Sequence, residues 1–331
     1  RWIQAAYEDA PESSIGKAAA VALYGKELEN SATELERFAA CAFAHFLQYG
    51  LKIEERQEYE FRQADLGNVI HQALEQFSRN LKKNQLTWRS LTDQERDQLI
   101  DTSVEETIHD YGNTILESSA RNQYMILRVK RILRRTVWAL QQQLKAGKYE
   151  PSRFEISFSM EEDLKASNFQ LSEEERLRLR GRIDRVDRYE EDDTIYVKVI
   201  DYKSGNTALD LTSVYHGLQL QLIVYLNAAL ELEEKNHPGK HAEPAGMFYY
   251  HVKDPLVDGK PGDEEEEIER KLLEKLKVDG LVRAEEKILK DLDRELEAGK
   301  KSLVIPAAYN KNGSLSSRSK TASKEQFEEL C

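Results

Sequence analysis

The chain has 331 residues, a formal net charge of −12 and two cysteines, Cys41 and Cys331. This length suits one large domain or two modest ones, and the acidic balance by itself argues against a general nucleic-acid binder. Two cysteines exclude a disulfide framework and fit a reducing cytoplasm, and without an apolar run of about eighteen residues we expect neither a membrane span nor a secretory signal.

The first 150 residues are predicted to be mostly helical. Residues 1–30 are Ala-rich with little periodicity and are expected to connect to an upstream region, because the chain does not start with Met. Ser31 followed by Glu34 forms a capping box, which predicts a helix over 31–51. Apolar residues on one face predict three more helices, at 66–83, 92–117 and 120–147. Residues 31–150 are therefore expected to form a helical part.

From Pro151 the pattern changes to strands. Alternating apolar residues predict four of them, at 153–160, 177–189, 193–205 and 245–252. In the first strand Phe154 and Ile156 are expected on one face together with Phe158, and the short acidic turn before the third strand predicts a hairpin. Helices are expected at 213–233, over most of 265–298 and from about Ser323, after a turn-rich stretch at 306–323. The pattern predicts an α/β fold with a mixed sheet and helices on both sides of it.

Two acids and a lysine fall near the tips of the predicted hairpin. In strand 177–184 the odd positions are apolar, and the even positions carry three arginines and then Asp184. Asp201 and Lys203 share a face of the next strand by the same period. If the strands pair, Asp184 and Asp201 converge at one end of the sheet with Lys203 beside them. Paired carboxylates suit Mg²⁺, which can polarise a phosphodiester oxygen, while a lysine stabilises the developing charge.

Ordinary alternatives exist for these residues. An isolated Asp-x-Lys pattern is more often a surface ion pair at a strand end, and His71 on an apolar helix is more often a core histidine. Asp187 lies on the opposite strand parity from Asp184, so it is not expected to join the same site. The metal-site hypothesis gains weight only because several such motifs occur in one chain.

These motifs together resemble a known enzyme family. GRIDRVDR at 181–188, followed by VIDYKSG at 199–205, resembles the core of RecB-type PD-(D/E)XK nucleases. Gly67 to His71 match the GxxxH helix of that family, and Gln221 to Tyr225 match its QxxxY helix. SATELERFAACAFAHF and NKNGSLSSRSK further resemble the AddB-type subunits of helicase–nucleases. The resemblance covers essentially the whole chain and implies a restriction-endonuclease-like core, with C-terminal helices, over 151–331.

The resemblance implies a Mg²⁺ site in this core. His71, Asp184 and Asp201 would be metal ligands, and the backbone carbonyl of Tyr202 would join them. Glu155 stays open between an acid that supports these ligands and an exposed strand residue.

The resemblance also implies roles for three residues beside the metal. Lys203 would be the catalytic lysine, and Gln221 and Tyr225 would contact the substrate or brace the site. The alternative for Gln221 and Tyr225, which are one helical turn apart, is ordinary packing.

Members of the AddB-type family share a [4Fe–4S] cluster, for which Cys41 matches the first ligand. Such a cluster usually needs four thiolates, and the three closely spaced cysteines that would follow are absent from this sequence. Cys331 lies in a helix-like segment and is not expected to be a ligand. The cluster is thus expected for the parent protein but not in this chain, where Cys41 alone would be a buried free thiol.

The function that the resemblance implies is a Mg²⁺-dependent DNA exonuclease in the cytoplasm. It would cut the 5′-terminated strand while an AddA-type helicase partner unwinds DNA during double-strand-break repair. A basic, acid-free stretch at 120–148, with the strand arginines Arg178, Arg180 and Arg182, would contact single-stranded DNA unless it is a solvated face. The alternatives are a non-catalytic DNA-binding scaffold and a stand-alone restriction-like endonuclease.

Overall fold

The protein is built around a six-stranded mixed β-sheet. The computed structural model describes residues 14–54, 63–110, 119–158, 164, 167–173, 175–259, 262 and 264–330. The strands of this sheet follow the order β2 (Glu150–Ser157), β5 (Arg182–Glu191), β6 (Thr194–Lys203), β7 (His241–His251), β8 (Asp279–Arg283) and β9 (Thr321–Ala322). The β6–β7 and β8–β9 pairs are parallel and the others are antiparallel, which confirms the predicted mixed α/β class.

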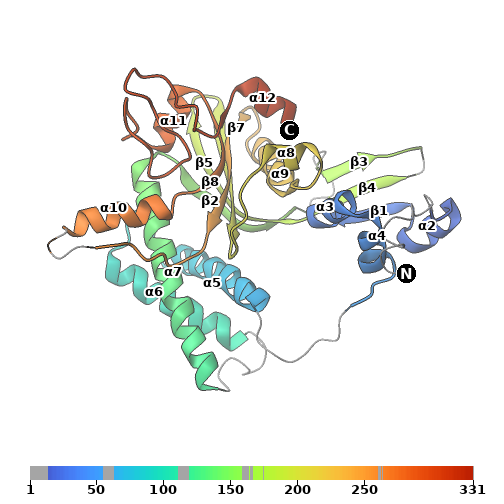
Figure 1. Ribbon diagram of the computed structural model, residues 1–331, viewed down its shortest axis with the longest axis horizontal. Coiled ribbons are helices and arrows are strands. Elements are labelled where there is room, and N and C mark those ends of the chain that lie inside the picture. The colour runs from blue at the N-terminus through green and yellow to red at the C-terminus, as the bar shows by residue number, and fades with distance from the viewer. Residues whose placement is uncertain are drawn as a thin grey trace, which may run out of the picture.

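Helices cover both faces of the sheet (Figure 1). One face packs against three helices, α5 (Gln63–Lys83), α6 (Asp93–Asp110) and α7 (Ala120–Ala146), and the other packs against α9 (Gln221–Asn236) and α12 (Lys324–Leu330). Strand β6 shows why both faces are filled. Its Val197 and Val199 belong to the apolar cluster of α9, whereas Ile200 and Tyr202 belong to the cluster of α5, α6 and α7. A strand buried on both faces is apolar at nearly every position.

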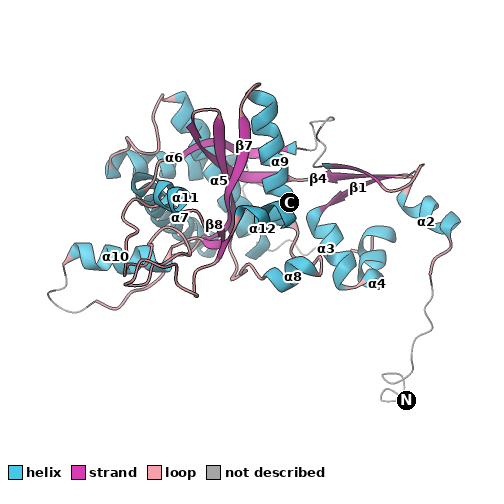
Figure 2. Cartoon of the chain, turned by 90° about the horizontal axis from the view of Figure 1, so that it is seen from above, coloured by secondary structure: helices cyan, strands magenta, loops and turns pink. Residues whose placement is uncertain are grey.

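A second, three-stranded sheet projects from this body (Figure 2). It contains β1 (Glu27–Ser31), β4 (Arg176–Arg180) and β3 (Asn168–Gln170), with β4 in the middle. Because β1 pairs in parallel with β4, the predicted border at residue 30 falls inside a strand that is hydrogen-bonded to residues 176–180.

The N-terminal helices confirm one prediction and correct another. The capping box is present, since the N–H of Glu34 donates to Ser31 Oγ at 3.2 Å and the N–H of Ser31 donates to Glu34 Oε2 at 2.8 Å. The helix expected over 31–51 is interrupted, however, because Cys41 has extended backbone with φ −165° and ψ 106°. The segment therefore contains α3 (Ala32–Ala40), α4 (Ala42–His45) and a π-helix (Phe46–Gly50), and a further helix precedes it, α2 (Lys17–Tyr24).

The predicted hairpin is confirmed, but the strand expected at 177–189 is wrong. It breaks at Gly181, and its two halves, β4 and β5, belong to different sheets. A Cβ at Gly181 would lie 2.5 Å from Phe158 Cζ and 3.2 Å from Tyr225 Cε1, so only glycine lets the backbone pass this close to those rings. Arg178 and Arg180 are consequently not in line with Asp184.

The helix expected over most of 265–298 is also wrong in part. It is two helices, α10 (Glu265–Lys275) and α11 (Glu286–Leu292), and β8 lies between them. Leu281 and Val282 of β8 belong to the apolar clusters on opposite faces of the sheet, so tertiary burial makes this short segment a strand. The helix predicted at 213–233 is likewise divided into α8 (Leu211–Tyr215) and α9.

The structure also bears on the membrane question. Among the helices in the described part of the chain, none combines the length and apolar character that a bilayer crossing requires.

Candidate active site

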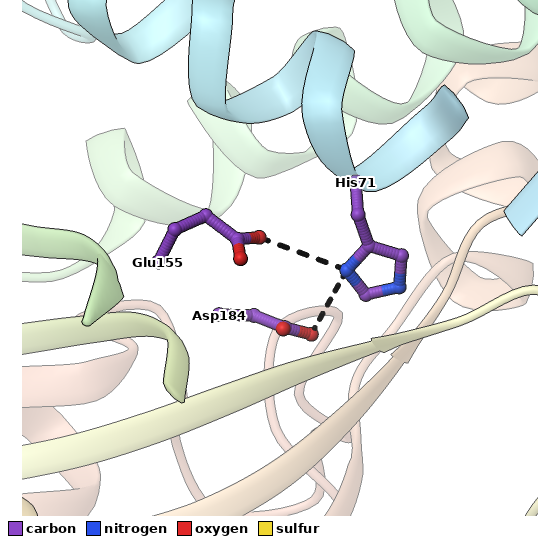
Figure 3. A group of neighbouring side chains, drawn as sticks. All are labelled: His71, Glu155 and Asp184. Atoms are coloured by element: carbon purple, nitrogen blue, oxygen red, sulfur yellow. Dashed lines mark ion pairs between the residues drawn. The ribbon is translucent and has the colours of Figure 1, made fainter. Parts of the chain in front are cut away.

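His71 reaches the sheet from helix α5. The apolar face of this helix, with Val69, Ile70 and Phe77, is buried against the sheet, and His71 projects beside it. Its Nδ1 lies 3.3 Å from Asp184 Oδ2 and 3.7 Å from Glu155 Oε1 (Figure 3). A Cβ on Gly67, one turn earlier, would lie 3.4 Å from Ser204 Oγ, so this end of α5 lies close to the chain that leaves β6.

Three acids lie in one row across neighbouring strands. Glu155 and Asp184 both stand between the ladder pairs Phe154–Arg185 and Ile156–Ile183 of β2 and β5. Asp184 and Asp201 both follow the pair Arg185–Ile200 of β5 and β6. In an antiparallel ladder such residues lie opposite each other, so we name Glu155, Asp184 and Asp201 the acidic row.

The backbone changes its pleat at the acidic row. Glu155 has φ +49°, a left-handed conformation that is uncommon for a residue with a side chain and often marks functional sites. Phe154 before it packs on the α5 side of the sheet, whereas Ile156 after it packs on the α9 side. The prediction that Phe154 and Ile156 share a face is therefore wrong.

Lys203 lies at the Asp201 end of the acidic row, in a chain of polar contacts. Its Nζ is 2.6 Å from Asp201 Oδ2 and donates to Gln221 Oε1 at 2.8 Å. Gln221 Nε2 in turn donates to the hydroxyl of Tyr225 at 2.9 Å. The ring of Tyr249 lies under the ammonium, with Nζ 5.3 Å from the ring centre. The residues of the DxK and QxxxY motifs are thus in direct contact.

Asp184 is also held by the neighbouring strand. The backbone N–H of Tyr202 donates to Asp184 Oδ2 at 2.7 Å, and this is the same oxygen that faces His71. The bond fixes the direction of the carboxylate. The role of the Tyr202 carbonyl as a metal ligand stays a prediction.

The pKa shifts show that negative charge is concentrated here. Burial alone would lower the pKa of His71, but hydrogen bonds and attraction to Asp184 and Glu155 raise it to about 10. Burial and the charge of Asp184 raise the pKa of Asp201 to about 7, although Lys203 opposes this. Burial also raises the pKa of Glu155, against the influence of His71. A cluster that holds protons this strongly would also attract a metal cation.

The donor atoms of three residues could hold such a cation. One ligand atom from each of His71, Glu155 and Asp184 lies within 4.8 Å of the other two. One imidazole and two carboxylates suit Mg²⁺ or Mn²⁺, so the site fits the metal that the sequence predicts. Asp201 is outside this group and contacts Lys203. Glu155 enters the group instead, and its Oε2 also lies 2.7 Å from Arg182 Nε.

Glu155 is the residue that sequence reasoning left open. Neither its spacing nor a motif marks it, because its place opposite Asp184 depends on the register of β2 against β5. A useful signal would have been an acid on the strand that precedes the hairpin.

Asp187 belongs to a separate buried ion cluster, consisting of Arg185, Asp187 and Lys198. Arg185 donates to both carboxylate oxygens of Asp187, at 2.5 and 2.9 Å, and Lys198 Nζ lies 3.2 Å from Asp187 Oδ2. The guanidinium lies over the ring of Trp88, 4.9 Å from its centre. This buried ion cluster faces α5 and α7 behind the sheet, away from Lys203 and Gln221.

Cys41 does not fit an iron–sulfur cluster in this chain. It is exposed, not buried as expected, and is the single cysteine among the residues that the structure describes. Cys331 lies outside the described residues. One thiolate cannot hold a cluster that needs four.

The basic stretch of α7 is largely neutralised. Lys130 Nζ lies 2.6 Å from Glu105 Oε1 of α6, and Arg134 pairs with Asp101 of the same helix. Arg131 Nε lies 2.6 Å from Asp254 Oδ2. The acids that are missing from the sequence around α7 come from other elements, which favours the solvated-face alternative for these three cations.

Comparisons with known proteins agree with the motifs. A model of the PD-(D/E)XK nuclease superfamily matches residues 29–313. The AddB subunit of the ATP-dependent helicase/deoxyribonuclease of Lachnoclostridium phytofermentans is 46% identical over 323 residues, which are 96% of this chain and 27% of the relative.

Two further relatives carry the same protein name. The one from Alkaliphilus metalliredigens is 39% identical over 96% of this chain and 27% of its own length, and the one from Thermoanaerobacter sp. is 39% identical over 93% and 26%. The chain therefore spans about a quarter of the length of the curated relatives that it matches.

Proposed function

This chain belongs to the PD-(D/E)XK nuclease superfamily, and from this premise we propose that the acidic row and Lys203 form a Mg²⁺-dependent site that hydrolyses DNA phosphodiester bonds. The family confirms the resemblance and the restriction-endonuclease-like class that the sequence predicts. The observation that carries the proposal is the acidic row itself, in which three buried acids meet His71 and Lys203 at adjoining strands.

Each residue has a role in this proposal. His71, Glu155 and Asp184 hold the metal ion, and Asp201 and the Tyr202 carbonyl complete its surroundings. The ion supplies Lewis acidity toward a phosphodiester oxygen and toward the leaving oxygen. Lys203, held between Asp201 and Gln221, presents its ammonium to the phosphate and stabilises the negative charge that grows there.

Gln221 and Tyr225 act as braces for Lys203. The side-chain amide of Gln221 accepts from the ammonium and donates to the hydroxyl of Tyr225, so it is fixed at both ends. Tyr225 is itself held against Phe158, with ring centres 6.0 Å apart. A fixed ammonium needs no rearrangement when the charge develops.

The names of the relatives extend the proposal to a larger assembly. We propose that the chain is the exonuclease module of an AddB-type subunit and works in the cytoplasm with an AddA-type helicase partner. It would cut the 5′-terminated strand during repair of double-strand breaks. In this arrangement residues 1–30 connect to a preceding region, 31–150 form the helical part and 151–331 form the nuclease core. A [4Fe–4S] cluster would need three thiolates from elsewhere in the longer protein.

The test is Asp184→Asn in the full-length protein assembled with its helicase partner. We expect cleavage of the 5′-terminated strand to fall on the order of 10³-fold or more, because a metal-binding carboxylate is lost. End-labelled duplex DNA with Mg²⁺ and ATP measures both strands separately. Glu190→Gln on the same strand is the control, since its carboxylate pairs with Lys240 far from the acidic row.

The competing functions give different results. Unchanged cleavage of both strands in Asp184→Asn would favour a non-catalytic DNA-binding scaffold. Cleavage of circular duplex DNA without ATP would favour a stand-alone endonuclease.

A further inference from the structure

The N-terminus of α9 is capped by a side chain from a distant helix. Glu36 of α3 places Oε1 2.7 Å from the backbone nitrogen of Leu220 and 3.1 Å from that of Gln221, and both N–H groups donate to it. The first N–H groups of a helix lack partners within it, and a carboxylate there also meets the positive end of the helix dipole. Leu220, at the N-cap position, has no side chain that could take this role.

Other contacts hold α3 against this corner. Leu35 packs on the apolar cluster that includes Leu222 and Leu226 of α9. A Cβ on Gly217, in the turn before α9, would lie 3.5 Å from Ala39 Cβ. Leu35 and Ala39 thus dock α3 on both sides of Glu36 in the sequence, which keeps the carboxylate at the helix end.

Gln221 links this cap to the acidic row. Its backbone N–H donates to Glu36, and its side chain accepts from Lys203 at 2.8 Å. We propose that Glu36 is a positioning residue that, by capping α9 at Gln221, sets where the Lys203 ammonium lies beside Asp201. This inference rests on the proposed nuclease function.

Electrostatics place Glu36 at the same corner of the site. The pKa of Tyr249 is raised by burial first, and then by the charges of Asp201 and Glu36. The ring of Tyr249 lies beneath the Lys203 ammonium. Glu36 is therefore within electrostatic reach of the groups that surround Lys203.

The experiment measures single-turnover cleavage by the full-length protein with its helicase partner. Glu36→Asp keeps the charge but is one methylene too short to reach α9, so we expect the cleavage rate to fall about tenfold, with the KM for DNA unchanged. Glu36→Gln keeps an acceptor oxygen at the same reach and should stay within about threefold of the wild type.

A double-mutant cycle separates positioning from general stability. In a Gln221→Ala background, Glu36→Asp should have no further effect on the rate, because the link to Lys203 is already broken. Asp210→Ala is the matched control. Asp210 caps α8 through the N–H groups of Thr212 and Ser213 and does not touch Gln221, so its loss should leave the rate unchanged.

Each result supports or overturns the inference. A wild-type rate in Glu36→Asp overturns it, and so does an equal loss with and without Gln221, which would mean that Glu36 acts elsewhere. Thermal melting of each variant identifies a rate loss that comes from unfolding, which the cycle with Gln221 would not cancel. If Asp184→Asn also cleaves normally, the proposed function itself has failed.

Discussion

Two buried aspartates on adjacent strands, Asp187 of β5 and Asp201 of β6, have opposite electrostatics. Both are shut off from solvent, with 0% and 2% exposure. Burial raises the pKa of Asp187, but Arg185 and Lys198 outweigh it, and the net shift is downward. For Asp201, burial and the neighbouring charge of Asp184 outweigh Lys203, and its pKa rises to about 7.

The difference shows how the same sheet builds a closed cluster and a reactive one. In the buried ion cluster, one acid meets two cations and aromatic rings cover the group. In the acidic row, three acids lie together and the cations nearest to them are half-buried or exposed. Burial alone does not separate structural from functional acids, whereas the balance of neighbouring charge does.

Asp187→Ala should give the largest effect on stability. It leaves Arg185 and Lys198 buried without a counter-charge, and we expect a loss of about 3–5 kcal/mol in the free energy of unfolding. Asp201→Asn is the contrasting change in the acidic row. Without metal it removes a repelling charge, so the free energy of unfolding should stay equal or rise. Urea unfolding in the presence of EDTA measures both, and similar losses in the two variants would break the comparison.

Mg²⁺ should stabilise the protein more at high pH than at low pH. The raised pKa values of Asp201 and His71 give the metal-free fold a stabilisation that is complete below their ordinary values of 3.8 and 6.5. It is lost as the pH rises through about 7 and about 10, when the acidic row becomes more negative. Mg²⁺ competes with the same protons, so its shift of the melting temperature should be larger at pH 8.5 than at pH 6. A shift independent of pH would place the cation elsewhere.

Glu155→Gln should weaken metal binding while leaving the fold intact. The amide keeps the shape of the side chain but removes one negative ligand from the group with His71 and Asp184, and we expect Mn²⁺ affinity to fall about tenfold. Titration calorimetry of the metal-free protein measures this. Unchanged affinity would restrict the site to His71, Asp184 and Asp201.

Arg182→Gln should have the smallest effect. The guanidinium pairs with Glu155 but is 54% exposed, so its loss should change the free energy of unfolding by less than about 1 kcal/mol. Because it competes for a metal-binding carboxylate, its removal should strengthen Mn²⁺ binding slightly in the same titration. A clear loss of stability would mean that the acidic row depends on this cation for its fold.

Sequence patterns predicted what depends on local order. The β5–β6 hairpin follows from alternation and an acidic turn, and α5 follows from its apolar face. Alternation assumes a constant pleat, so it did not show the left-handed residue at Glu155 or the break at Gly181. The cap from Glu36 and the acids that neutralise α7 come from elements far away in the sequence, and no local pattern marks such contacts.

Strand β1 decides where a shorter version of this protein can begin. It is the parallel neighbour of β4, and its last residue, Ser31, also caps α3. A version that starts at Ala32 would leave one side of Arg176–Arg180 as an open edge that can pair with another molecule. Trimming for expression or crystallisation should therefore retain the whole strand from Glu27 onward, so that the preparation stays free of edge-to-edge association.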